Sequence, residues 1–127
     1  MKDKSILVDM STTIIHHGHI RLLKKANKFG KVIVALTTDQ EIKKNKKINV
    51  ILNYKQREEI LKSIKYVHRV IPSKWKITNK FLKKNKIDLI VRGHDHEKDN
   101  FKIKKKIFKR TKGISSSSII NKIMKNR

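Results

Sequence analysis

The chain of 127 residues carries 34 Lys and Arg against 10 Asp and Glu, for a net charge of +24, and it contains no cysteine. This length suits one domain, residues 1–127, with a buried core, and the missing cysteines exclude disulfides and thiolate metal sites. No apolar run reaches the length of a signal-peptide core or of a membrane span, so we expect a soluble, cytoplasmic protein.

The first half of the chain alternates between strand-like and helix-like patterns. The segment Ser5–Val8 predicts a short buried strand, and the apolar spacing over residues 20–29 predicts a helix with Gly30 as its C-cap. Lys31–Thr38 is β-branched and apolar on both faces, which predicts a second strand inside a parallel sheet. The lysine-rich stretch 41–50 has weak periodicity and predicts a short helix or a mobile loop.

The alternation continues through the middle of the chain. Asn53 and Gln56 have the spacing of a capping box, which predicts the start of a helix. Val67–Pro72 predicts a third strand, residues 77–87 predict a helix, and Asp88–Gly93 predicts a fourth strand.

The last quarter predicts a weaker fifth strand at Lys105–Arg110 and a closing helix at Ser115–Asn126, entered from serines that favour N-cap positions. Strands that alternate with helices are typical of a parallel α/β sheet. We therefore expect an α/β fold with a parallel sheet of about five strands.

Three histidines in four positions stand between the first strand and the first helix. In open α/β sheets, ligands bind beyond the carboxyl ends of the strands, often with a phosphate at a helix N-terminus. His16 and His19 could donate hydrogen bonds to phosphate oxygens there, and Gly18 would let a ligand approach the backbone. Two alternatives stay open at this point: histidines that only cap the helix or face solvent, and a zinc site completed by residues 94–96.

The segment "RTKGISSSSI", residues 110–119, repeats the arrangement of strand, loop and helix N-terminus. Arg110 offers a planar guanidinium that suits phosphate, Gly113 a flexible turn, and Ser115 and Ser116 hydroxyls beside free helix N–H groups. This pattern predicts a second anion-binding loop, with a plain serine N-cap as the alternative.

Together the two segments resemble the motifs of a known family. "HHGH" matches the H-x-G-H motif of the cytidylyltransferases, and "RTKGISSSSI" resembles their second signature, R-T-x-G-I-S-[ST]-[ST]. The stretches "YKQREEILKSIKYV" and "IDLIVRGHD" are similar to those of glycerol-3-phosphate cytidylyltransferases. The resemblance implies a Rossmann-like, doubly wound fold, usually a homodimer, that uses CTP and Mg²⁺ to transfer CMP to a small phosphorylated compound.

The resemblance also implies roles for single residues. His16 and His19 would stabilise the transition state, and Lys46, or its neighbours Lys44 or Lys47, would belong to a basic loop over the triphosphate. Mg²⁺ would be held through the triphosphate, with no protein ligand assigned securely. The expected nucleotide contacts are Met10, Ser11, Gly18, Arg110, Thr111, Gly113, Ile114, Ser115 and Ser116.

Departures from the family pattern concern the acceptor. The usual G-T-F-D before the histidines reads Met10 to Thr13 here, like a variant of phosphonate or phosphocholine pathways, and the usual G-D-D-W reads G-H-D-H at residues 93–96. We expect acceptor contacts from Asp95, Arg57 and Trp75. Asp95 could instead contact Mg²⁺ or only solvent. Arg57 could instead have a structural role, and Trp75 could instead be part of the core.

Two rival functions follow from the same sequence. An adenylyltransferase would share the histidine motif, because that motif does not read the base. A nucleic-acid-binding protein without activity would use the charge of +24, part of which could also reflect a codon bias toward lysine. The sequence lacks the interleaved aromatic residues of a stacking platform, so we do not expect a nucleic-acid partner.

Overall fold

The computed structural model describes residues 4–93, 100–108 and 116–126, and these contain a five-stranded parallel sheet with the order β3-β2-β1-β4-β5. The sheet confirms the predicted α/β class with parallel strands. Its strands are β1 (Ser5–Met10), β2 (Lys31–Thr37), β3 (Val67–Ser73), β4 (Leu89–Arg92) and β5 (Lys104–Ile107).

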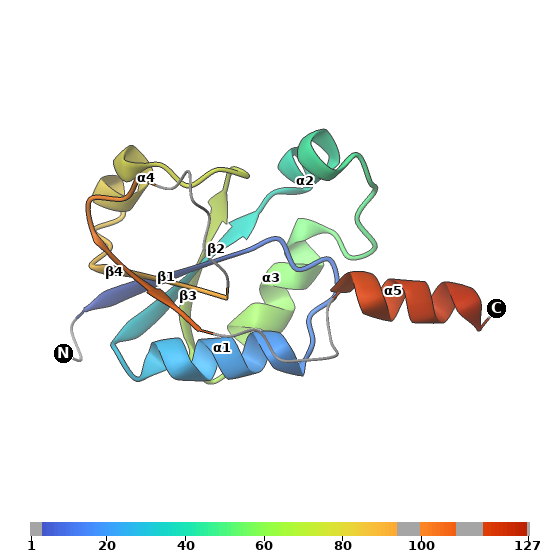
Figure 1. The fold of residues 1–127 in the computed structure, drawn as a ribbon, viewed down its shortest axis with the longest axis horizontal. Coiled ribbons are helices and arrows are strands. Elements are labelled where there is room, and N and C mark those ends of the chain that lie inside the picture. Colours follow the sequence, from blue (N-terminus) through green and yellow to red (C-terminus); the bar gives the residue numbers. More distant parts are fainter. Residues whose placement is uncertain (1–3, 94–99, 109–115, 127) are drawn as a thin grey trace.

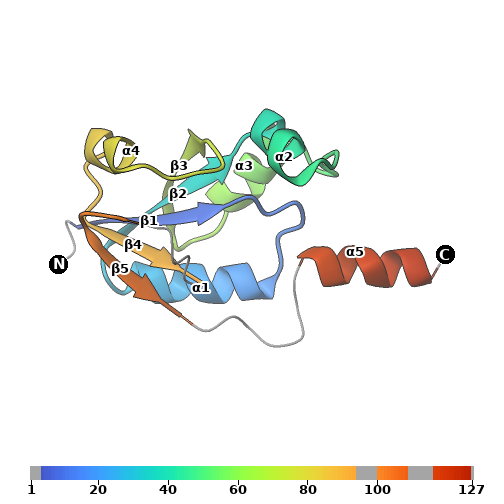
Figure 2. The same cartoon turned by 45° about the horizontal axis from the view of Figure 1, so that its top comes forward.

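Helices cover both faces of the sheet, so the fold is doubly wound as expected (Figure 1). Helices α1 and α3 pack on one face and α4 packs on the other. Figure 2 shows α1 and α4 on opposite sides of the sheet. Helix α5 extends away from the sheet in both views. The helices are α1 (His17–Asn27), α2 (Asp39–Lys46), α3 (Tyr54–Lys62), α4 (Asn79–Lys84) and α5 (Ser116–Lys125).

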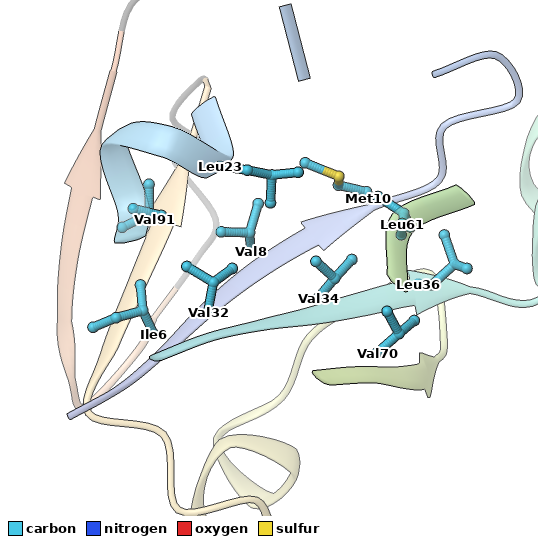
Figure 3. Packing of buried hydrophobic residues seen from close by; sticks show 11 residues of the cluster. Ile6, Val8, Met10, Leu23, Val32, Val34, Leu36, Leu61, Val70 and Val91 are labelled. Atoms are coloured by element: carbon cyan, nitrogen blue, oxygen red, sulfur yellow. The ribbon is translucent and has the colours of Figure 1, made fainter. Parts of the chain in front are cut away.

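Each face of the sheet packs its own set of apolar side chains, because alternate residues of a strand point to opposite faces. On one face, Val8 and Val34 of the central strands lie under Leu23 of α1 and Leu61 of α3, and all four are fully buried (Figure 3). The opposite face buries a smaller cluster under α4: Leu7, Ile33, Ala35, Ile77, Leu82, Ile87 and Ile90. Two-sided burial explains why the central strands are continuous apolar runs.

The predicted elements occur in the predicted order, with one error at the end of α1. The helix ends at Asn27 and its C-cap is Lys28, whose backbone is still right-handed, so Gly30 is not the C-cap. Gly30 instead lies directly before β2, where a Cβ atom would overlap the carbonyl oxygen of Lys4. The position requires glycine because two backbones approach closely, not because a helix ends there.

Two helix starts follow from local sequence. The Asn53 side chain accepts from the Gln56 N–H at 2.9 Å and the Gln56 side chain accepts from the Asn53 N–H at 2.9 Å, which confirms the predicted capping box of α3. The first part of the lysine-rich stretch, as far as Lys46, lies in the short helix α2, capped by Thr38, whose hydroxyl accepts from the Glu41 N–H at 3.4 Å. Within the described ranges, no helix has the length and apolarity that crossing a membrane requires.

Candidate active site

The carboxyl ends of the strands gather the candidate residues at one edge of the sheet. Strand β1 is central and pairs with β2 on one side and with β4 on the other. The chain continues from β1 to β2 in one direction and from β4 to β5 in the opposite direction, so a crevice is expected beyond the carboxyl ends of β1 and β4. The β1–α1 connection, residues 11–16, lies at this edge of the sheet.

Two histidines build the N-terminus of α1 by reciprocal capping. The Nδ1 atom of His16 accepts from the Gly18 N–H at 3.1 Å, and the Nδ1 atom of His19 accepts from the His16 N–H at 3.1 Å. Their rings are tilted against each other by 31°, with centroids 3.9 Å apart. The structure thus places His16, Gly18 and His19 together, and the exposed His17 outside this pair.

These bonds set the protonation of the two rings. A nitrogen that accepts a hydrogen bond carries no proton, so each neutral imidazole holds its proton on Nε2. Burial lowers the pKa of His16 below its ordinary value, and the charge that His17 can carry lowers this pKa further. The pair in its neutral form therefore presents Nε2–H donors at the positive end of a helix dipole.

The histidines cap the helix, as one alternative in the sequence allowed, and this role does not exclude a ligand at Nε2. The zinc alternative receives no support from the described part of the chain, where no group of three or more His, Asp or Glu side chains could hold a metal ion. Residues 94–96, the expected source of further ligands, lie outside the described ranges.

Met10 and Ser11, predicted nucleotide contacts, lie where β1 ends. The Met10 side chain is 6% exposed and packs in the core, and its carbonyl accepts from the Thr37 hydroxyl at 3.2 Å. The Ser11 carbonyl accepts from Arg57 Nη1 at 2.6 Å. A ligand could therefore meet Met10 only through its backbone, and the carbonyls of both residues are already bound.

Arg57 is fully buried beneath this connection. Its guanidinium donates to three carbonyls, of Ser11 at 2.6 Å, Thr37 at 3.0 Å and Leu52 at 3.1 Å, and to the Asp39 carboxylate at 2.6 Å. The sequence left an acceptor contact and a structural contact open for this residue. In the structure Arg57 makes the structural contact. Because its guanidinium already forms four hydrogen bonds to the protein, direct contact between Arg57 and an acceptor is not favoured.

Lys46 and Trp75, predicted for different parts of the site, are neighbours. Lys46 is the last residue of α2, and its Nζ lies 5.6 Å from the centroid of the Trp75 ring. The backbone N–H of Trp75 donates to the Glu41 carboxylate at 2.9 Å, which ties the β3–α4 connection to α2. Trp75 is 40% exposed, so one part of the ring supports α2 and another faces solvent.

Several predicted residues lie outside the described ranges: Asp95, Arg110, Thr111, Gly113, Ile114 and Ser115. Ser116 is the first residue of α5, and only its backbone is described. In both views α5 begins beside the β1–α1 connection and the start of α1 (Figures 1 and 2). The two helix N-termini that the sequence singled out are thus brought close together.

Sequence reasoning missed three features of this edge. Thr12 has a left-handed backbone, with φ of 35°, and is 4% exposed. Asp39 anchors Arg57, and a bidentate ion pair joins Asp9 of β1 to Arg92 of β4, with both N–O distances at 3.1 Å. The sequence did contain a signal for the ion pair, because a charged residue near the end of a buried strand needs a partner of opposite charge.

Comparisons with known proteins agree with this geometry. The Cytidylyltransferase-like family model matches residues 13–122. The chain belongs to this family. Glycerol-3-phosphate cytidylyltransferase from Staphylococcus aureus is 38% identical over 124 residues, which cover 91% of this chain and 92% of that protein. FAD synthase from Pyrococcus horikoshii is 36% identical over 96 residues, covering 74% of this chain and 65% of that protein.

A solved structure shares the fold. The crystal structure of the lipopolysaccharide core biosynthesis protein from Thermoplasma volcanium GSS1 superposes with a TM-score of 0.72 at 22% identity, covering 85% of this chain and 98% of that one. The Rossmann-like architecture expected from the motifs is thereby confirmed. Family membership likewise confirms the prediction of a cytidylyltransferase-type enzyme, a nucleotidyltransferase.

Proposed function

We propose that the protein transfers CMP from CTP to a small phosphorylated alcohol or a phosphonate and releases pyrophosphate. The observation that carries the proposal is the capped histidine pair, in which His16 and His19 both engage Nδ1 in the helix cap. Their Nε2–H groups can then donate to phosphate oxygens beside the positive end of α1. An imidazole aimed in this way supplies directed hydrogen bonds that the surrounding lysines do not.

In this reaction an oxygen of the acceptor attacks the α-phosphorus of CTP in line with the departing pyrophosphate. The bond from that oxygen to phosphorus forms while the bond to the α,β-bridging oxygen breaks, and the bridging oxygen keeps the electron pair. Charge that develops on the phosphoryl oxygens would be stabilised by His16 and His19, and Lys46 would add positive charge, as the family resemblance implies. The acceptor is itself an anionic nucleophile, so no covalent intermediate with the protein is needed.

Magnesium bound with the triphosphate would neutralise part of its charge. The carboxylates described near the strand ends already have partners, because Asp9 pairs with Arg92 and Asp39 pairs with Arg57. This donor set suits a metal carried by phosphate oxygens better than a resident metal held by the protein. We therefore propose Mg²⁺ as a companion of the nucleotide.

The acceptor is to be identified by a screen with CTP. Trp75 presents an exposed ring that already attracts a cation, Lys46, and an aromatic face of this kind also suits a quaternary ammonium group. The screen compares glycerol 3-phosphate, phosphocholine, phosphoethanolamine and 2-aminoethylphosphonate by pyrophosphate release. A preference for phosphocholine that is lost in Trp75→Leu would assign the ring to the acceptor.

The similarity to an FAD synthase favours one second candidate, an adenylyltransferase. FAD contains an AMP moiety, so an enzyme of that kind would use ATP. Offering each of the four nucleoside triphosphates with the same acceptors separates the two functions. Pyrophosphate release with ATP alone would replace CTP in the proposal, and tight RNA binding without any turnover would contradict both.

A homodimer is part of the proposal through the family resemblance alone. Light scattering coupled to size-exclusion chromatography measures the mass of the particle in solution. A particle of about 30 kDa, twice the chain mass of 15.0 kDa, is the expected result, and a particle of the single-chain mass would reject the dimer.

The first test of the chemistry replaces His19 by Gln. Glutamine at this position can keep the capping box, because its side chain reaches back to the N-cap N–H, but it removes the imidazole. We expect turnover to fall by about 100- to 1,000-fold, as when one donor to a developing oxyanion is removed. Circular dichroism should show an unchanged fold.

His17→Gln is the matched control, since His17 is exposed and outside the capping pair. Its turnover should stay within about twofold of the parent, which is the ordinary range of surface substitutions. Near-normal turnover of His19→Gln would refute the role of the imidazole.

A further inference from the structure

Arg57 is the most completely buried charged group that the structure describes, and its contacts converge on the site. Its relative exposure is 0%, and four hydrogen bonds join it to four different segments at the carboxyl edge of the sheet. These segments are the β1–α1 connection through Ser11, the end of β2 through Thr37, the start of α2 through Asp39 and the approach to α3 through Leu52. A buried guanidinium can adopt this arrangement because its N–H groups form a rigid fork.

The residue next to the bound Ser11 carbonyl is strained. Thr12 has φ of 35°, a left-handed conformation that a β-branched residue adopts only at a free-energy penalty, and its buried Oγ1 has no hydrogen-bond partner among the described residues. The two preceding carbonyls are both held, that of Met10 by the Thr37 hydroxyl at 3.2 Å and that of Ser11 by Arg57 at 2.6 Å. Strain of this kind persists only where the surroundings impose it.

The strained residue stands four positions before the helix cap. The chain runs from Thr12 to His16, so the direction in which it leaves β1 determines where the capped histidine pair lies relative to the sheet. We propose that Arg57 is a positioning residue, which holds the β1–α1 connection with Thr12 in its left-handed conformation and thereby fixes the positions of His16 and His19. The inference rests on the proposed function where it is tested by turnover of CTP, but the test by hydrogen exchange does not depend on that function.

A comparison of Asp39 with Arg57 separates an effect on the position of the histidines from an effect on the stability of the fold. Asp39 shares the ion pair with Arg57, and its other carboxylate oxygen accepts from the Tyr54 N–H at 3.1 Å, and neither of these bonds reaches the β1–α1 connection. Asp39→Asn should therefore weaken the fold while Arg57 keeps its bond to Ser11. Arg57→Lys keeps a positive charge but cannot make four bonds in a fork.

The kinetic experiment measures kcat and KM for CTP in Arg57→Lys and Asp39→Asn at a temperature where both variants are fully folded. We expect Arg57→Lys to lower kcat by about 100-fold with a small change in KM, since a misplacement of about 1 Å has effects of this size on catalysis. Asp39→Asn should lower kcat by less than about tenfold. Arg69→Lys, an exposed residue of β3, is the control for the exchange of Arg for Lys.

A second substitution tests the strain directly. Glycine adopts positive φ without penalty, so Thr12→Gly should let the connection keep its conformation when the hold of Arg57 is weakened. In the Arg57→Lys background, Thr12→Gly should recover at least fivefold of the lost kcat, a coupling that independent sites would not show. Equal loss in Arg57→Lys with and without Thr12→Gly would overturn the inference.

Hydrogen exchange gives a readout that does not depend on turnover. In Arg57→Lys the amides of Gly18 and His19 should exchange at least tenfold faster than in the parent, while amides of the central strand β2 keep their protection. Unchanged exchange at Gly18 and His19 would overturn the inference even if kcat falls. If the parent shows no CTP turnover, the proposed function fails, and the exchange experiment still decides the role of Arg57.

Discussion

At the scale of single residues, the capped histidine pair uses the Nδ1 atom of each ring to cap α1. His16 is the N-cap of α1 and His19 stands three positions later, and serine with glutamate is the usual pair for these two places. Imidazoles satisfy the same backbone N–H groups through Nδ1 and also carry a proton on Nε2. The helix cap and the proposed donors are therefore inseparable.

This double use predicts a pH dependence of stability. Burial, and then the charge of His17, lower the pKa of His16 in the folded protein, whereas in the unfolded chain it is about 6.5. The unfolded chain binds the proton more readily, so the stability that neutral His16 contributes is complete above about pH 6.5. It is lost as the pH falls from there through the lowered pKa, where the Nδ1 acceptor of the cap becomes protonated.

The measurement compares thermal unfolding midpoints at about pH 5.5 and about pH 7.5 for the parent and for His16→Asn. Asparagine caps a helix well and does not titrate, so the variant should lose less stability between these pH values than the parent does. Identical losses in the two proteins would show that His16 does not contribute to the acid sensitivity.

The residues that sequence reasoning placed correctly are those whose signals are local. The positions of His16 and His19 follow from the end of a strand and the start of a helix, both of which are visible in the sequence. The partners of Arg57 are backbone carbonyls, which have no sequence signature, and they come from segments separated by up to 46 residues. Likewise the strain at Thr12 arises from bonds to its neighbours and not from its own type.

At the scale of elements, an ion pair joins the neighbouring strands β1 and β4. Asp9 lies near the end of β1 and Arg92 ends β4, and their side chains are 24% and 7% exposed. The guanidinium of Arg92 also lies 5.0 Å from the centroid of the Phe101 ring. Since strands β1 and β4 are registered near their starts, this pair extends their association toward the carboxyl edge.

The pair predicts a strong and non-additive effect on stability. Arg92→Met should leave the Asp9 carboxylate partly buried without its partner, and we expect a loss on the order of 2–3 kcal/mol in the free energy of unfolding. The double variant Asp9→Asn with Arg92→Met should be less destabilised than the sum of the single variants. Urea denaturation measures both, and strict additivity would show that the two side chains do not interact in solution.

Element boundaries could be predicted to within one or two residues where the pattern is continuous, as in β2, which ends at Thr37 instead of Thr38. The error at Gly30 has a definite cause. A glycine shortly after a helix usually ends that helix, but here it makes room for the backbone before β1 at Lys4, and such a contact between distant segments leaves no local signal.

At the scale of the whole molecule, like charges dominate. The net charge of +24 leaves far more basic groups than the 10 acidic residues can neutralise, so the folded chain repels itself. We expect the midpoint of thermal unfolding to rise when NaCl increases from about 0.02 M to about 0.3 M, because salt screens exposed charges over the Debye length. Differential scanning fluorimetry at neutral pH provides the measurement. A falling midpoint would mean that the few ion pairs outweigh the repulsion.

The architecture as a whole could be predicted because it depends on patterns repeated along the chain. Apolar strands alternating with helices indicate a parallel sheet, and the paired motifs resembled those of a nucleotide-binding family. The path of α5 could not be predicted in the same way. Its apolar residues include Ile123 and Met124, which are 57% and 58% exposed, so burial in this domain does not explain its pattern.

The two outer strands of the sheet have a consequence for how the chain behaves at high concentration. An open strand edge offers unpaired N–H and C=O groups to any passing strand, and natural sheets discourage this with charges and prolines. Strand β5 carries the exposed Lys104 and Lys106, and β3 at the other edge carries Arg69 and Pro72. Two copies that meet at β5 would bring lysine ammonium groups together, and at β3 Pro72 has no backbone N–H to donate to a neighbouring strand. Both features oppose growth of the sheet into fibrils.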